Sequence, residues 1–169
     1  TWVEPTQSAD TKQSALDWCG LSFAGFLFLA YNSSGNRLHM WDPGKGTEHR
    51  VGLATPDPPT VATNGGAGLT FTRYYRIRTI DIDGGVLRFR SEASTSVTIS
   101  ITDDASVRVT RPTLPTFEGE THWEVEYADA STGPWYRASQ VATGTTFYDD
   151  AAATISTTMH ITQIVAHTT

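Results

Sequence analysis

The residues RYYRIRTIDIDGGVLRFRSEAS, at positions 73–94, decide the fold of this chain. Apolar and polar side chains alternate on both sides of Gly84-Gly85, and a period of two residues is typical of β-strands with one buried face. Glycine adopts the positive φ that a tight turn between antiparallel strands requires. We therefore predict a β-hairpin whose strands run over residues 73–82 and 86–90.

After Arg73 at its first position, this hairpin carries four further arginines: Arg76, Arg78, Arg88 and Arg90. Arg76 and Arg78 fall on the face of the first strand that is opposite to the expected core, so we expect them to point outward. The register across the turn places Asp81 opposite Arg88, as a pair of unlike charges. The arginines are either a plain solvated face or a contact for an acidic partner, because arginine favours paired hydrogen bonds with carboxylates at interfaces.

Downstream of the hairpin the same pattern continues. Short alternating segments are separated by turn residues, and this spacing is typical of a β-sandwich. We predict strands at residues 96–102, 106–111, 122–127, 135–141, 145–148 and 157–167. Trp123 falls on the inward face of its strand and is expected in the core. No segment has the apolar period of a helix longer than one or two turns.

Upstream of the hairpin, segments at 21–31, 37–41 and 48–53, of which the first two contain aromatic residues, predict a three-stranded meander. The stretch Pro56–Pro59 holds three prolines, which cannot lie in a central strand, so we place a boundary there. Residues 1–17 are polar, with a short helical turn possible over residues 9–17. We divide the chain into an N-terminal arm (1–17), an aromatic β-meander (18–55), a hairpin unit (56–95) and a β-sandwich (96–169).

The composition excludes several classes of function. Hydrophobic residues make up 38% of the chain and charged residues 18%, which is the balance of a folded protein. The net charge of −6 is opposite in sign to that of proteins that bind nucleic acids, so no such partner is expected. The longest apolar run, about eleven residues, is shorter than a membrane-spanning helix needs, and no membrane is expected. Cys19 is the only cysteine and is expected to be a small buried side chain.

No arrangement of residues indicates an active site. The sequence contains no nucleophile elbow, phosphate loop or dinucleotide-binding fingerprint. Asp81-Ile82-Asp83-Gly84 begins like a calcium loop but lacks the later ligand positions. His39 and His49 are expected to face each other across a turn, in a spacing that matches no zinc motif. Glu124 and Glu126 alternate with apolar residues, so we expect a solvated sheet face. We predict no enzyme and no catalytic, cofactor-binding or metal-binding residue.

Several segments resemble parts of fibronectin type III domains. Residues 75–81, Gly84 and Ser91-Glu92-Ala93-Ser94 resemble the last hairpin of that fold. Its central strands are resembled by residues 121–127 and 133–136, and its strand E by residues 145–150. It implies an all-β chain in which a β-meander is followed by one or more fibronectin-III-like or immunoglobulin-like β-sandwich domains.

The order of the parts resembles virion proteins of tailed bacteriophages. An aromatic meander with a Trp41-Asp42-Pro43 turn is followed by prolines and by an arginine-rich hairpin. The resemblance implies a non-enzymatic structural component of a tail, neck or connector, or capsid surface, located in the extracellular particle. The expected partners are other virion proteins and copies of the chain itself in a homo-oligomeric assembly, with no cofactor. The candidate partner contacts are Trp2, Arg76, Arg78, Arg88 and Arg90.

Aromatic side chains leave a second function open. Sugars stack on flat, exposed aromatic rings, and Trp135 and Tyr136 are adjacent in the sequence. These two residues are the candidate glycan contacts of a carbohydrate-binding or adhesion module for host recognition. Trp135 also falls at a strand position that suits a core.

Overall fold

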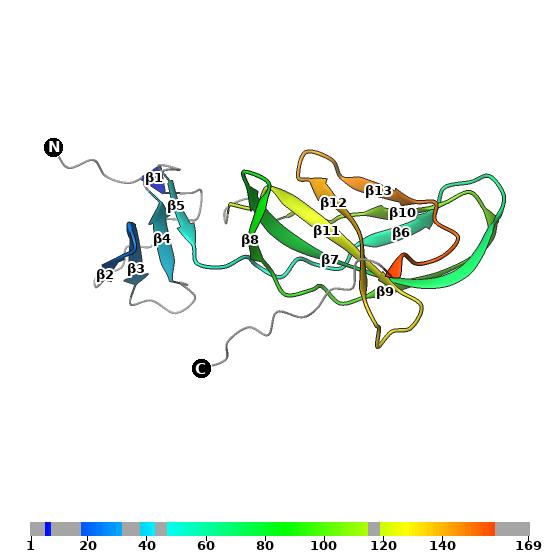
Figure 1. Ribbon diagram of the computed structural model, residues 1–169, viewed down its shortest axis with the longest axis horizontal. Helices are drawn as coiled ribbons and strands as arrows, with labels where there is room; N and C mark the ends of the chain where they lie inside the picture. The colour runs from blue at the N-terminus through cyan, green and yellow to red at the C-terminus, as the bar shows by residue number, and fades with distance from the viewer. Residues whose placement is uncertain (1–5, 8–17, 32–37, 43–46, 115–118, 158–169) are drawn as a thin grey trace.

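The computed structural model describes residues 6–7, 18–31, 38–42, 47–114 and 119–157 (Figure 1). Within these residues the chain forms thirteen β-strands in three sheets and no α-helix. Every pair of neighbouring strands except β1 and β5 is antiparallel. The prediction of an all-β chain is confirmed for this part. Trp2, the possible helical turn at 9–17 and all but the first residue of the predicted strand at 157–167 lie outside the described residues.

The first sheet has the strand order β1-β5-β4-β3-β2. Its strands are β1 (Thr6–Gln7), β2 (Trp18–Phe23), β3 (Phe26–Tyr31), β4 (His39–Asp42) and β5 (Thr47–Arg50). Strands β2 to β5 follow one another as antiparallel neighbours. The apolar run that we expected as one strand is a hairpin, because Ala24 and Gly25 both have a positive φ, of 53° and 86°, and reverse the chain there.

The remaining strands form two sheets at the other end of the molecule in Figure 1. One sheet has the order β13-β10-β6, and the other has the order β12-β11-β7-β8, with β9 also paired to β7. The strands are β6 (Thr60–Thr63), β7 (Leu69–Asp83), β8 (Val86–Arg90), β9 (Val97–Asp104), β10 (Val107–Thr110), β11 (His122–Ala128), β12 (Tyr136–Ala142) and β13 (Phe147–Asp150).

Strand β7 is fifteen residues long and connects both halves of this region. One of its edges pairs with β11, and the other pairs with β9 near its start and β8 near its end. Strand β6 pairs with β10. We expected residues 56–95 and 96–169 to form two units, but strands from both ranges lie in common sheets. Without the later strands, β6 and β7 would have unpaired edges along most of their length.

Two serines, rather than a strand, close the edge of β7 between β9 and β8. The N–H of Ser91 donates to the carbonyl of Thr79 at 2.9 Å, and its Oγ accepts from the Thr79 N–H at 3.0 Å. Ser94 makes the same two hydrogen bonds with Ile77, at 2.9 and 3.0 Å. Both serines are buried. Their hydroxyl groups therefore supply the acceptors that the carbonyls of a neighbouring strand would supply.

The apolar core draws its side chains from both of these sheets. Its buried members are Tyr75, Ile77, Ile101, Val107, Val109, Leu114, Trp123, Val125 and Tyr127. Tyr75 and Ile77 occupy the inward face of β7 as predicted, and Trp123 is fully buried as predicted. The indole N–H of Trp123 donates to the Thr145 carbonyl at 2.9 Å, so its one polar atom is satisfied. Full burial of such a large apolar side chain stabilises the fold by about 1.5–3 kcal/mol.

The register of the hairpin differs from the expected one. Asp81 lies opposite Phe89, because an irregularity between Asp81 and Ile82 shifts the pairing of β7 with β8. Arg88 contacts Asp83 instead, at 3.3 Å, and both side chains are more than half exposed. The expected pair of Asp81 and Arg88 is therefore wrong, since a bulge changes which residues face each other.

A buried ion pair links β7 in one sheet to β13 in the other. Arg73 Nη1 donates to Asp150 Oδ2 at 2.6 Å, and each side chain is only 1% exposed. The hydroxyl of Tyr75 donates to the same oxygen at 2.7 Å. The guanidinium group also lies 4.0 Å from the ring centroid of Phe71 and donates to the Ala152 carbonyl. Both charges are thus removed from water and paired with each other, and only the buried Nε of Arg73 lacks a hydrogen-bond partner among the atoms of this pair.

The same contacts shift the ionisation of the groups involved. Burial raises the pKa of the Tyr75 hydroxyl far above its usual value, and the negative charge of Asp150 adds to this effect. Burial works against the charge of Arg73, but Asp150 more than offsets it and raises the pKa of that guanidinium. Burial and the charge of Asp150 also raise the pKa of Tyr148 to about 12. The site therefore holds one charged pair and neutral tyrosines.

Replacement of Asp150 by Asn leaves the charge of Arg73 buried without a carboxylate. We expect Asp150→Asn to lower the free energy of unfolding by about 3–5 kcal/mol, measured by urea denaturation. Asp149→Asn is the matched control, because Asp149 pairs with Arg108 in a partly exposed ion pair. That change should cost much less. Equal losses in the free energy of unfolding for the two variants would show that the buried pair of Arg73 and Asp150 has no special role in stability.

Candidate interaction face

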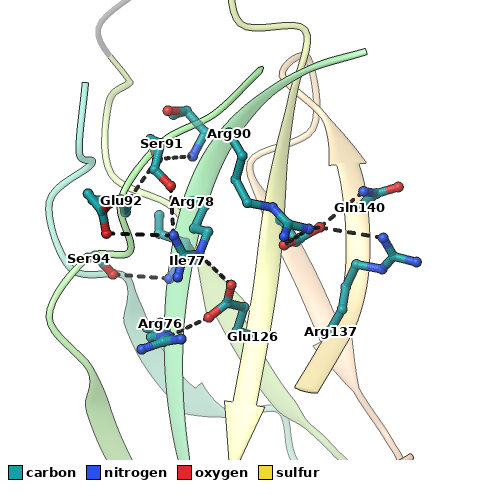
Figure 2. Close-up of polar contacts among 12 residues, drawn as sticks. Arg76, Ile77, Arg78, Arg90, Ser91, Glu92, Ser94, Glu126, Arg137 and Gln140 are labelled. Atoms are coloured by element: carbon teal, nitrogen blue, oxygen red, sulfur yellow. Dashed lines mark hydrogen bonds and ion pairs between the residues drawn. The ribbon is translucent and has the colours of Figure 1, made fainter. Parts of the chain in front are cut away.

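Charged side chains gather on one face of the sheet β12-β11-β7-β8, on the side away from the core (Figure 2). We call this set the Arg–Glu face. Its members are Arg76, Arg78, Arg90, Glu124, Glu126 and Arg137. Four of the six are arginines, and they come from β7, β8 and β12, whereas both carboxylates come from β11.

The strand register brings these charges together. Residues of β7 and β11 that lie directly opposite each other point to the same face of the sheet. The register pairs Glu124 with Arg78 and Glu126 with Arg76. Because side chains alternate along a strand, Arg76 and Arg78 of β7 and the two glutamates of β11 reach the face away from Tyr75 and Trp123, whereas Arg73 lies on the same side as Tyr75.

Glu126 is fully buried and binds two arginines. Arg78 Nε donates to its Oε1 at 2.5 Å, and Arg76 Nε donates to its Oε2. Arg78 also donates to the carbonyl of Ser91 at 2.7 Å and lies 4.0 Å from Glu92, whose side chain is 74% exposed. A buried carboxylate is satisfied in this way by charge-assisted hydrogen bonds on both of its oxygens.

Glu124 is the second fully buried carboxylate of the Arg–Glu face. Arg90 Nη2 lies 2.9 Å from each of its oxygens, and Gln140 Nε2 donates to Oε2 at 3.0 Å. Arg137 Nη1 lies 3.7 Å from the same Oε2. Arg90 and the pair on β12 thus approach this carboxylate from opposite sides of β11, and Figure 2 shows Arg90 facing Gln140 and Arg137.

Trp135 covers one end of the face. The guanidinium group of Arg76 lies 4.1 Å from the centroid of the Trp135 ring, a cation–π contact. Gly133 has a φ of +84°, and a Cβ atom there would lie 2.8 Å from the Trp135 ring. Burial lowers the pKa of Arg76, with Arg78 acting in the same sense and Glu126 opposing both. The glycine therefore leaves room for the ring to stack on a desolvated charge.

The structure corrects two expectations about these residues. Arg76 and Arg78 do point away from the core, but Arg78 is 6% exposed and both glutamates are 0% exposed, so the expected solvation of the arginines and of the acidic face was wrong. The reason is that each carboxylate has two arginine neighbours, which cover it. Sequence reasoning missed Gln140 and Arg137 altogether. Two arginines in one strand and two glutamates in another, each spaced by one residue, were the signal for cross-strand pairing.

The two aromatic glycan candidates lie in different surroundings. Trp135 is half-buried against Arg76, whereas Tyr136 lines an open hollow of about 450 Å³. Other residues that line this hollow are Phe71, Arg73, Asp129, Pro134 and Ile155. Aromatic and apolar walls with a few polar groups are typical of small-molecule sites. The hollow brings Tyr136 together with residues that the sequence analysis had not connected to it.

Other candidate residues do not form a site in the described part of the chain. The register places His49 opposite Met40 rather than opposite His39. Among the described residues no three His, Cys, Asp or Glu side chains form a metal-binding group. Cys19 is exposed, which corrects its expected burial. The described residues form no helix that is long and apolar enough to span a membrane.

Comparisons with known proteins do not assign the chain to a family. No family model matches the sequence, and no curated protein or solved structure matches it.

Replacement of Glu126 by Gln removes the charge that Arg76 and Arg78 share. We expect Glu126→Gln to lower the free energy of unfolding by about 3–5 kcal/mol in urea denaturation, because two guanidinium groups lose their buried partner. Glu92→Gln is the control, since this mostly exposed side chain lies 4.0 Å from Arg78. It should leave stability nearly unchanged. A stable Glu126→Gln variant would show that the buried pairs do not support the fold.

Proposed function

We propose that this chain is a non-enzymatic structural component of a tailed-bacteriophage virion, in the tail, neck or connector, or capsid surface. In this proposal the region after residue 56 is a fibronectin-III-like or immunoglobulin-like β-sandwich. It contacts other virion proteins or copies of itself in the extracellular particle. The order of the meander, the prolines and the arginine hairpin supports the virion origin, and a core shared by two antiparallel sheets is compatible with the sandwich.

The observation that carries a contact function is the apolar surface of strand β2. Leu21 and Phe23 are 68% and 67% exposed. The register places Leu21 opposite Phe28 and Phe23 opposite Phe26, so these four side chains share one face of the first sheet. Large apolar side chains that gather on a surface mark a site of interaction with another protein.

The position of β2 adds to this argument. Strand β2 lies at one end of the strand order of its sheet, so among the described strands it pairs on one side only. Its sequence, WCGLSF, contains no charged residue and no proline. Natural proteins usually protect an edge strand with charges or proline against pairing with other chains. An unprotected apolar edge is what strand addition by a neighbouring subunit requires.

We expect the purified chain to self-associate through this edge. Lysine at both Leu21 and Phe23 should weaken the association about tenfold or more, because apolar area is lost and charge is added at the contact. Light scattering over a concentration series measures this. Val86→Lys is the control, since Val86 is 58% exposed on the edge strand β8 of another sheet. A monomeric wild-type chain, or equal effects of both changes, would overturn the proposal.

Carbohydrate binding is the second candidate, and the hollow beside Tyr136 favours it. Tyr136 and Phe71 offer aromatic rings there, and Asp129 offers a hydrogen-bond acceptor. We expect saturable binding to a glycan array that Tyr136→Ala abolishes and Tyr136→Phe retains. A wild-type chain that binds no glycan on the array would remove this candidate.

A further inference from the structure

The Arg–Glu face carries an excess of positive charge. Its four arginines and two glutamates sum to +2, in a chain whose net charge is −6. Both carboxylates are fully buried and already have two arginine neighbours each. Glu92 lies beside Arg78 but is 74% exposed, so water screens most of its effect. Desolvated charges of one sign are unfavourable without a compensating partner. The face is therefore suited to a further anion.

Arg90 and Arg137 are the two arginines of the Arg–Glu face that can reach a further anion. They approach Glu124 from β8 and β12, and their side chains are 19% and 29% exposed. The Nε of Arg90 is buried and has no hydrogen-bond partner among the described residues, so an incoming anion meets the partly exposed end of this side chain. Arg76 is covered by Trp135, and Arg78 is bound to the Ser91 carbonyl.

We propose that Arg90 and Arg137 together bind a carboxylate group of an acidic segment on a partner protein. A guanidinium group has five N–H donors in a planar fork, so each arginine can contact Glu124 and a second carboxylate at the same time. The amide of Gln140 already holds one oxygen of Glu124 at 3.0 Å and fixes the position of that carboxylate. Glu124 thereby holds both arginines ready for the incoming group.

The place of Arg137 in the sheet favours a protein segment over a small anion. Strand β12 stands at the end of the order β12-β11-β7-β8, so among the described strands only β11 pairs with it. A neighbouring chain can approach along this edge and pair with the backbone while an acidic side chain reaches Arg137. The partner that fits is an extended segment rich in Asp or Glu. The inference deepens the proposed assembly role by naming the chemistry of one contact.

Titration calorimetry with a hexaglutamate peptide tests this proposal. We expect saturable binding that weakens steeply as the salt concentration rises. A hexaglutamine peptide, inorganic phosphate and acetate should bind much more weakly or not at all. Arg137→Gln should lower the affinity for hexaglutamate about tenfold or more, since a charge-assisted pair is lost. Arg88→Gln is the matched control, because Arg88 lies on the same hairpin but is 55% exposed and paired with Asp83.

A second measurement uses only the wild-type chain, so it does not depend on whether a variant folds. In the NMR spectrum of the wild-type chain, the Nε–Hε signals of Arg90 and Arg137 should shift on addition of hexaglutamate, and that of Arg88 should not. No binding of hexaglutamate, or equal losses for Arg137→Gln and Arg88→Gln, would overturn the proposal. Binding of phosphate as tight as that of the peptide would show a small-anion site instead. The monomeric double lysine variant at Leu21 and Phe23 should still bind the peptide, so the two proposals fail separately.

Discussion

The buried pair of Arg73 and Asp150 is the contact on which the two-sheet region depends. A guanidinium group inside a protein needs a carboxylate close by, and the nearest one comes from β13 in the opposite sheet. The pair therefore fixes the position of β7 relative to β13 as well as adding to the apolar contacts. Tyr75 and the Ala152 carbonyl hold the same two groups, so the arrangement has little freedom to change.

Buried guanidinium groups on the opposite face of β7 also have carboxylate partners. Arg76 and Arg78 are covered by protein and share Glu126, and the second glutamate of β11 holds Arg90 and Arg137. Most of the hairpin charge is thus used inside the molecule rather than offered to solvent. The positive charge that the glutamates leave uncompensated is available to a partner. It lies at Arg90 and Arg137, whose side chains are still partly exposed. The internal pairs and the proposed external contact are two consequences of one charge imbalance.

Sequence patterns predicted most strands after residue 69, because alternation is a local property, but they missed β6 and took the hairpin of β2 and β3 for one strand. Tyr75, Ile77 and Trp123 lie on inward faces as their alternation indicated. The partners of the arginines were not predictable in the same way, because Arg78 and Glu126 are 48 positions apart and only the strand order brings them together. Asp149 and Asp150 show most clearly why sequence patterns do not predict the partners of charged residues. They are identical neighbours in sequence, yet one is half-buried beside Arg108 and the other is buried beside Arg73.

The two proposed contacts differ in their physics, and this difference constrains how an assembly responds to its surroundings. The edge of β2 is uncharged and apolar, so salts that strengthen apolar burial leave it intact or reinforce it. The contact at Arg90 and Arg137 is electrostatic and partly exposed, so salt screens it. Apolar contacts have little directional preference, whereas paired hydrogen bonds between guanidinium and carboxylate groups do. The first contact is therefore suited to hold subunits together, and the second to set their orientation.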